Sequence, residues 1–406
     1  MKTLSLSSLA TQLVPLSDWE QQFDDLTQRL APRFARPEAR QQASDYLRGL
    51  LSPVERKNGW QLAELLGHSA PHRVQHLLDR AVWDDALVRS DLRAYVKEYL
   101  AEERAVLVVD ESGFLKKGDK SVGVKRQYCG TAGRIENCQV GVFLGYASSR
   151  GHTLLDATLY LPEEWANDQK RRKQAKVPET VEFATKPQLA QRMLLAALEA
   201  GVPAAFVTAD SVYGNDAPLR ASLQNRRQAY VLAIKCDLRL PWEDGQIRAK
   251  TLAKRLPTSA WQTLSCGAGA KGERLFDWAY VPLDAPDQEG FAYGLLVRRS
   301  LAAPEEIAYY WVFAPRDTPL TTLVAVAGKR WTIEVCFESA KGEVGLDEYE
   351  VRSWHGWHRH ITLSMLAHAF LTAVRKESLE PLVKGGSAIP RHSLRQFKLS
   401  RGLCCP

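Results

Sequence analysis

The sequence lacks the patterns that mark small metal-bound domains, secreted proteins and membrane proteins. Its seven cysteines form no Cys-x-x-Cys pair, and no histidine stands at zinc-ligand spacing from any of them. A disulfide framework is not expected in a chain of 406 residues, so we predict reduced thiols in a cytosol. No apolar run approaches the ~20 residues that a membrane span needs, and the first residues contain no sustained apolar stretch typical of a secretory signal. These absences predict a cytoplasmic protein without a membrane partner.

The composition is that of an ordinary globular protein, with 45% hydrophobic and 25% charged residues and no internal repeats. The length suffices for two or three domains and a sizeable core. The net charge of +7 is moderately basic. It permits a nucleic-acid partner without establishing one, so the local clusters of charge are more informative than the total.

Residues 1–100 predict an all-α N-terminal domain, because apolar side chains recur at helical spacing. One helix ends at Gly67, and Ser69 is placed to cap the next one. This outline is typical of a helix-turn-helix, and its second helix would bring Arg73 and Gln75 to DNA. The alternative is a plain helical bundle with a charged outer face.

Residues 101–235 alternate between strands and helices. The predicted order is three strands, a helix, a strand, a helix and a strand, which matches the α/β core of a ribonuclease-H-like fold. We predict strands over 106–110, 139–147, 153–160, 204–209 and 230–234, and helices over 187–200 and 215–226.

The rest of the chain divides into three parts. Residues 236–312 contain four tryptophans and short alternating runs, which predict a mostly β insertion. Residues 313–378 regain a helical pattern and would complete the catalytic core with a second part. Residues 379–406 form a basic tail.

Two aspartates stand at the ends of buried strands in the predicted core. Asp110 closes the run Ala-Val-Leu-Val-Val, and Asp210 closes Ala-Phe-Val-Thr-Ala. Ligand sites in such sheets form just outside the carboxyl ends of the strands. Two carboxylates there, joined by a third from a helix, would make an oxygen-only site for hard divalent cations. The alternative for each aspartate is a turn residue or a helix cap.

The third carboxylate is Glu334, in a segment that predicts a helix. Arg330, Glu334 and Lys341 fall within roughly 40° of one another at helical spacing, so one face would offer a carboxylate flanked by two phosphate-binding cations. Glu338 lies on the same face and is the reserve candidate, whereas Glu343 points to the opposite face. The alternative is a helix surface with ordinary ion pairs.

Basic residues follow Asp110 and could hold a phosphodiester near the metal ions. These residues are Lys116, Lys117, Lys120, Lys125 and Arg126. A solvated loop is the alternative, as it is for a second basic run over 170–173.

Two other patterns approach known ligand-binding motifs without matching them. Asp119 interrupts the segment 113–121, which otherwise approaches a nucleotide-binding P-loop, and puts a negative charge in the phosphate cradle. The cluster 354–360 contains three histidines but no carboxylate at a fixed spacing, so we predict polar packing or a DNA-backbone contact rather than a metal site.

The combination Arg-x3-Glu-x6-Lys after two strand-end aspartates resembles the C-terminal signature of bacterial insertion-sequence DDE transposases, in which the pattern is Tyr-x2-Arg-x3-Glu-x6-Lys. More closely, the chain resembles the insertion sequence 701 family from about residue 30 to 375. The resembling stretches are Val109–Gly130, Asn137–Val140, Ala209–Gly214, Lys329–Glu334 and Gly345–Trp354. One position departs from the pattern, because Ala327 stands where the signature has tyrosine.

The resemblance implies a ribonuclease-H-like fold with a β insertion and assigns the catalytic metal ligands to Asp110, Asp210 and Glu334. It implies two Mg²⁺ ions, for which Mn²⁺ can substitute, and contacts from Arg330 and Lys341 to DNA phosphates. Trp331 either stacks on a base at the cut end or packs in the core.

The implied activity is cut-and-paste transposition. Its partners would be double-stranded DNA, both the terminal inverted repeats and the target, bound by a homodimer in the bacterial cytoplasm at the nucleoid. Relatives with this signature can pass through a hairpin intermediate, and Ala327 puts that step in question here. The alternatives are a sequence-specific DNA-binding protein without strand transfer and a nuclease of the same fold.

Overall fold

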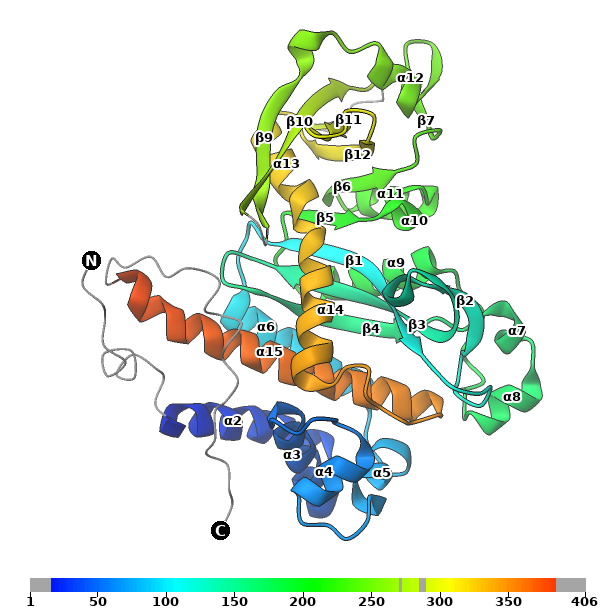
Figure 1. Ribbon diagram of the computed structural model, residues 1–406, viewed down its shortest axis with the longest axis vertical. Helices are drawn as coiled ribbons and strands as arrows, with labels where there is room; N and C mark the ends of the chain where they lie inside the picture. The colour runs from blue at the N-terminus through cyan, green and yellow to red at the C-terminus, as the bar shows by residue number, and fades with distance from the viewer. Residues whose placement is uncertain (1–15, 270–271, 285–289, 385–406) are drawn as a thin grey trace.

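The computed structural model describes residues 16–269, 272–284 and 290–384 of the chain. Three tiers follow one another along the long axis: N-terminal helices, a mixed sheet, and a strand-rich block (Figure 1). The helices are α2 (Leu16–Leu30), α3 (Pro37–Leu51), α4 (Gly59–Leu65), α5 (His72–Asp79), α6 (Asp85–Leu100), α7 (Glu163–Ala166), α8 (Gln169–Gln174), α9 (Lys186–Glu199), α10 (Ser211–Gly214), α11 (Ala217–Asn225), α12 (Ala249–Lys254), α13 (Leu320–Lys329), α14 (Trp331–Val344) and α15 (Trp354–Lys384), with short 3₁₀ turns η1 (Ala31–Arg33), η2 (Gly130–Ala132) and η3 (Thr258–Ala260). The strands are β1 (Val106–Leu115), β2 (Lys125–Cys129), β3 (Arg134–Ala147), β4 (His152–Leu159), β5 (Phe206–Ala209), β6 (Ala229–Ile234), β7 (Arg239–Trp242), β8 (Gly245–Arg248), β9 (Gln262–Gly269), β10 (Gly272–Pro282), β11 (Phe291–Arg299) and β12 (Ile307–Pro315).

The middle tier is a mixed sheet in which β4, β3, β1, β5 and β6 lie side by side in that order. β5 is parallel to β1 and β6, whereas β3 is antiparallel to β1. The mixed α/β class and the strand and helix alternation predicted for 101–235 are confirmed. The prediction missed β2, because its polar residues do not show the apolar run of a buried strand.

The strands of the tryptophan-rich segment 236–312, here called the Trp-rich block, continue this sheet. β12 pairs with β6 over five residue pairs, from Tyr309–Ile234 to Phe313–Tyr230, and β11, β10 and β9 follow in order. The block is mostly β, as predicted, and it lengthens the sheet to ten strands. β7 and β8 pair with each other in a small second sheet.

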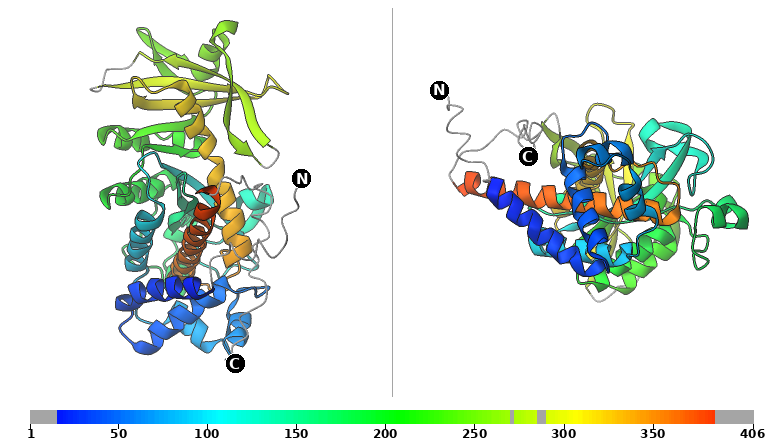
Figure 2. Two further views of the ribbon diagram at one scale, coloured as in Figure 1. Left: turned by 90° about the vertical axis from the view of Figure 1, so that its left-hand side faces the viewer. Right: turned by 90° about the horizontal axis from the view of Figure 1, so that it is seen from below.

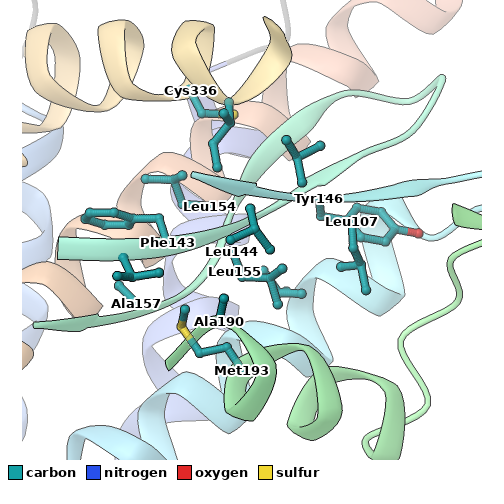
Figure 3. Packing of buried hydrophobic residues seen from close by; sticks show 14 of the residues in the cluster. Leu107, Phe143, Leu144, Tyr146, Leu154, Leu155, Ala157, Ala190, Met193 and Cys336 are labelled. Atoms are coloured by element: carbon teal, nitrogen blue, oxygen red, sulfur yellow. The ribbon is translucent and has the colours of Figure 1, made fainter. Parts of the chain in front are cut away.

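Helices cover both faces of the central strands. Figure 3 shows Cys336 of α14 on one side of the strands and Ala190 and Met193 of α9 on the other. The run Val106–Val109 is therefore buried along its whole length, as is typical of a strand covered on both faces.

The N-terminal helices pack against α15, which lies between them and the sheet (Figures 1 and 2). The rings of Trp19 and Phe23 on α2 lie 5.6 and 5.8 Å from the ring of Phe370 on α15. Residues 16–100 contain helices and no strand, which agrees with the predicted helical character of this part.

The predicted helix–turn–helix outline is present in α4 and α5. Asn58 caps α4 by accepting hydrogen bonds from the backbone N–H groups of Trp60 and Gln61, each at 3.0 Å. Gly67 then adopts a φ of 71°, a conformation that glycine tolerates best. The prediction that Ser69 caps the next helix is wrong, because α5 begins at His72 without any side-chain cap.

The polar residues of α15 form buried hydrogen bonds. His360 bonds the Tyr46 hydroxyl at 2.7 Å and the Gly345 carbonyl at 3.1 Å. His368 bonds the hydroxyls of Thr153 and Ser339, at 3.0 and 2.6 Å. Within the cluster 354–360, the contacts of His360 and the 2.9 Å contact of His358 with the Trp354 carbonyl agree with the predicted polar packing, whereas His368 lies outside that cluster.

Five cysteines fall within the described residues, and each is a free thiol. None of the helices in this part of the chain, the 31-residue α15 included, combines the length and the apolarity needed to cross a membrane.

The buried histidines predict loss of stability in acid. Burial lowers the pKa of His360 and of His368 to about 3, from an ordinary value of 6.5. The unfolded chain takes up protons below about pH 6.5, whereas the folded chain does so only near 3, so the contribution to stability is present above 6.5 and is lost as the pH falls. The free energy of unfolding should fall by up to ~1.4 kcal/mol per pH unit for each histidine.

Urea unfolding between about pH 7.5 and 4.5 measures this slope. His368→Gln should reduce the slope by up to ~1.4 kcal/mol per pH unit, which corresponds to one proton. His72→Gln serves as the control, because His72 is exposed. An unchanged slope in His368→Gln would contradict the assignment.

Candidate active site

The parallel register of β1 and β5 brings the two aspartates together. Val109 pairs with Ala209, and the next residues along the two strands are Asp110 and Asp210. The prediction that this strand ends at Asp110 is wrong. β1 continues to Leu115, because β3 pairs with it over its whole length. The sequence pattern marked where the parallel pairing ends rather than where the strand ends.

Asp210 also serves as a helix cap. Its carboxylate accepts a hydrogen bond of 2.8 Å from the Val212 N–H at the start of α10. A Cβ on Gly214 would lie 1.9 Å from the Ala233 carbonyl oxygen, so α10 rests directly on β6. The cap alternative therefore holds for Asp210, and this close packing fixes its position beside Asp110.

The aspartate pair is electrostatically unfavourable on its own. Burial, and then the nearby charges of Asp210 and Glu111, raise the pKa of Asp110 to about 7. Burial and the charge of Glu111 also raise the pKa of Asp210. Two desolvated carboxylates side by side are stabilised in their ionised forms by a cation between them.

Arg330 supplies a positive charge at the junction of α13 and α14. Its guanidinium Nη1 lies 3.4 Å from Glu334 Oε1 and 3.7 Å from Asp110 Oδ2. Arg274 holds the junction in place by donating a hydrogen bond of 3.0 Å to the Gly328 carbonyl. The backbone of Gly328 packs closely against β9, because a Cβ at this position would lie 2.0 Å from the Cys266 carbonyl oxygen. Arg330 and Glu334 share one side of the helix, as their spacing predicts.

The other charged residues of α14 lie elsewhere. Glu338 is exposed one turn further along, and Glu343 is ion-paired at 2.6 Å with Arg375 of α15. Lys341 donates to the Thr131 hydroxyl at 3.1 Å, near the far end of β1. The structure thus brings Glu334, and not Glu343, toward the aspartates.

Glu111 is a neighbour of this site that the sequence reasoning missed. It accepts a hydrogen bond of 2.5 Å from the Tyr213 hydroxyl and is ion-paired at 2.7 Å with Lys186. These contacts join β1 to α10 and α9. The sequence contains a signal for this contact, because Glu111 follows Asp110 directly and Tyr213 lies in the Ala209–Gly214 stretch, but the strand-end pattern by itself selects only the aspartates.

The basic residues that follow Asp110 have different surroundings. Lys116 is half-buried, with its ammonium 3.5 Å from the centre of the Tyr349 ring, and burial lowers its pKa to about 8. Lys125 is ion-paired with Glu164 at 2.6 Å. The side chains of Lys117, Lys120 and Arg126 are exposed.

The exposure of individual side chains bears on three other predictions. The basic run 170–173 is not a loop but lies in α8, where Arg172 is buried and donates to backbone carbonyls. Trp331 is 48% exposed, so the core-packing alternative for it is wrong. Arg73 and Gln75 of α5 are both exposed.

The carboxylates suit a hard metal ion in chemistry but are not gathered around one point. Among the residues that the structure describes, no three histidine, cysteine or acidic side chains are close enough to hold a metal. Arg330 stands between Asp110 and Glu334, whereas Asp110 and Asp210 are already adjacent. The segment 113–121 leads from β1 into turns and not into a helix, so it is not a P-loop.

Comparison with known proteins identifies the family. Residues 29–258, more than half of the chain, match the model of the DDE superfamily endonuclease family. The chain belongs to this family. It is also 30% identical, over 189 residues, to the probable transposase for insertion sequence element IS701 of Microchaete diplosiphon, a match that covers 46% of this chain and 47% of the relative. The chain therefore spans about half the length of that curated relative, and the predicted family resemblance is confirmed.

The raised pKa of Asp110 predicts that Asp110→Asn stabilises the metal-free protein. The acid has an ordinary pKa of 3.8 and a folded value of about 7, so ionising it opposes folding as the pH rises through this window. Above about pH 7 the full cost applies, and removing the charge should add on the order of 1–4 kcal/mol to the free energy of unfolding.

Urea unfolding at about pH 8 in a chelator checks this. Asp85→Asn is the contrast, because burial of that carboxylate is outweighed by the positive charge of Arg89, which holds the pKa of Asp85 below its ordinary 3.8; removing its charge should destabilise the protein by about 1 kcal/mol. A less stable Asp110→Asn protein would sink the prediction.

Proposed function

We propose that this chain is a DNA transposase that cuts transposon ends and joins their 3′-hydroxyls to target DNA. The observation that supports it most is the adjacency of Asp110 and Asp210 at the end of the parallel β1–β5 pairing, with Glu334 and Arg330 facing them. The strand order β4-β3-β1-β5-β6 supports a ribonuclease-H-like core, and the match to a probable transposase supports the substrate.

In this proposal Asp110, Asp210 and Glu334 hold two Mg²⁺ ions, for which Mn²⁺ can substitute. When bound, the ions would activate water and stabilise the attacking and leaving oxygens of the phosphodiester. Glu334 joins the aspartates when Arg330 releases it. The freed guanidinium is then placed to bind a phosphate with its paired N–H donors.

Glu111, Tyr213 and Lys186 act as positioning residues. The Tyr213 hydroxyl and the Lys186 ammonium each bind one oxygen of Glu111, which keeps this carboxylate off the metal site and ties β1 to α10. The distance between Asp110 and Asp210 is then set by three elements rather than by the strand pairing alone.

The DNA contacts are proposed from exposure. Lys117, Lys120, Arg126 and Trp331 are available to phosphates or bases. Lys116 and Lys341 are largely occupied by protein groups, so their contribution would be to support the strand end and α14. Joining two ends requires two active sites, so we propose a homodimer on DNA.

A nuclease of the same fold is the second candidate, because the matched family is one of endonucleases. It would use the same carboxylates and differ in not joining the cut end to a target. Joining is therefore the deciding measurement, and Ala327 in place of the signature tyrosine makes the hairpin intermediate a separate question.

Labelled transposon-end DNA with Mg²⁺ tests the proposal. Wild type should nick the end and join it to a second duplex, and Asp110→Ala, Asp210→Ala and Glu334→Ala should each lower both rates by at least ~10³-fold. Glu338→Ala is the matched control on α14 and should keep most of the activity. Absence of nicking by wild type would refute the enzyme proposal, and nicking without joining would leave the nuclease.

The role of Glu111 predicts weaker metal binding when it changes. Glu111→Gln retains the size of the side chain but removes the negative charge near the aspartates, so Mn²⁺ affinity should fall by roughly 10-fold. Calorimetric titration with Mn²⁺ measures this without any turnover. Glu343→Gln, which alters a glutamate paired with Arg375, is the control, and equal affinities in the two variants would contradict an electrostatic contribution of Glu111 to metal binding.

A further inference from the structure

A cleft of about 760 Å³ lies where α5 meets the catalytic core. One wall is the exposed side of α5, with His72, Gln75, His76 and Arg80. The other wall is formed by the loop after β1 and the segment before α15, with Lys120 and Arg352. These residues come from three separate parts of the sequence, so the cleft exists only in the folded chain.

The cleft is positively charged. Five lysines and arginines and two acidic residues line it. One of the acids, Asp79, is already neutralised by Lys176 at 2.8 Å and accepts a hydrogen bond from the Ser353 hydroxyl, also at 2.8 Å. Glu350 is exposed, so the excess of cations suits an anionic ligand.

Lys57 belongs to the wall of the cleft. Its residue surface is 6% exposed, its ammonium donates a hydrogen bond of 3.4 Å to the Val54 carbonyl, and the negative charges of Glu348 and Glu343 act on it. The cations that remain for a ligand are therefore the exposed Arg80, Lys120 and Arg352.

Both walls are held in place by hydrogen bonds. Asp79 fixes the end of α5 to Ser353, and Arg359 donates to the Leu78 carbonyl at 3.2 Å. On the opposite wall the Val122 N–H donates to the Arg352 carbonyl at 3.0 Å. The exposed side of α5 is therefore one side of a fixed cleft and not a free ridge.

This geometry does not suit insertion of α5 into a DNA duplex. A recognition helix must enter a major groove about 12 Å wide and 8.5 Å deep, whereas the exposed residues of α5 line a cleft together with Lys120 and Arg352. The volume of the cleft is in the range of ligand pockets. An extended single strand, bound through its phosphates, fits these limits.

The cleft is also connected to the candidate active site by β1. Asp110 lies five residues before Leu115, a distance of about 17 Å in an extended strand, and the loop with Lys120 follows directly. β1 therefore spans the distance between Asp110 and the part of the cleft that carries Lys120.

We propose that this cleft binds one DNA strand through its phosphates, without reading sequence, and guides that strand toward Asp110 and Asp210. The inference rests on the proposed function for the identity of the ligand as DNA. It places Gln75, His76 and Arg80 on a strand-binding surface instead of a major-groove reading helix.

Fluorescence anisotropy with the full chain tests it, using a short labelled single strand and a hairpin duplex in a chelator. The triple variant Lys120→Ser, Arg80→Ser, Arg352→Ser should bind the single strand about 10-fold more weakly or worse, and its slope of log affinity against log salt should fall by about 2, or ~0.7 for each lost contact. The matched control is Arg239→Ser, Lys254→Ser, Arg255→Ser, which removes three exposed cations near α12 and should bind as wild type does.

The outcomes separate the possibilities. Wild-type affinity of the triple variant for the single strand overturns the proposal, and so does a larger loss for the duplex together with weakened duplex binding by Arg73→Ser, which would restore the major-groove role of α5. A photoreactive group at Gln75 should crosslink to the single strand in preference to the duplex, which checks the site in otherwise unaltered protein. If wild type fails to cut DNA but shows this cleft-dependent binding, the proposed function fails and the strand site stands.

Discussion

The parallel pairing of β1 with β5 is the constraint on which the candidate site depends. It sets two aspartates side by side in a place where burial and mutual repulsion oppose their charges. The rest of the site is arranged around this unfavourable pair. Arg330 offers a positive charge from one direction, and Tyr213 and Lys186 hold the third nearby acid, Glu111, in a fixed place.

Much of the fold could be predicted because the relevant signals are local. Apolar runs were sufficient to place β3 to β6, and helical spacing placed α9 and the side shared by Arg330 and Glu334. Asp110 and Asp210 were identified for the right reason, since each follows a run that is buried on both faces.

What could not be predicted depends on partners distant in sequence. The length of β1 is decided by β3, and the burial of Lys116 is decided by Tyr349, more than two hundred residues away. The continuation of the sheet into the Trp-rich block depends on the pairing of β12 with β6, which no local pattern encodes. Likewise, the sequence predicts that α5 is the second helix of a helix-turn-helix. The cleft beside it depends on Lys120 and Arg352, which are distant in sequence and line it together with α5.

The shared sheet has a mechanical consequence for the Trp-rich block. Five consecutive residue pairs join β12 to β6, and β6 is itself the neighbour of β5, which Asp210 directly follows. Arg274 of β10 bonds the carbonyl of Gly328, two residues before Arg330. The block and the two aspartates therefore belong to one continuous sheet. A force on the block, for example from a bound partner, would be transmitted to the strands that carry the aspartates and to the junction of α13 and α14 together, because no hinge separates them in the described part of the chain.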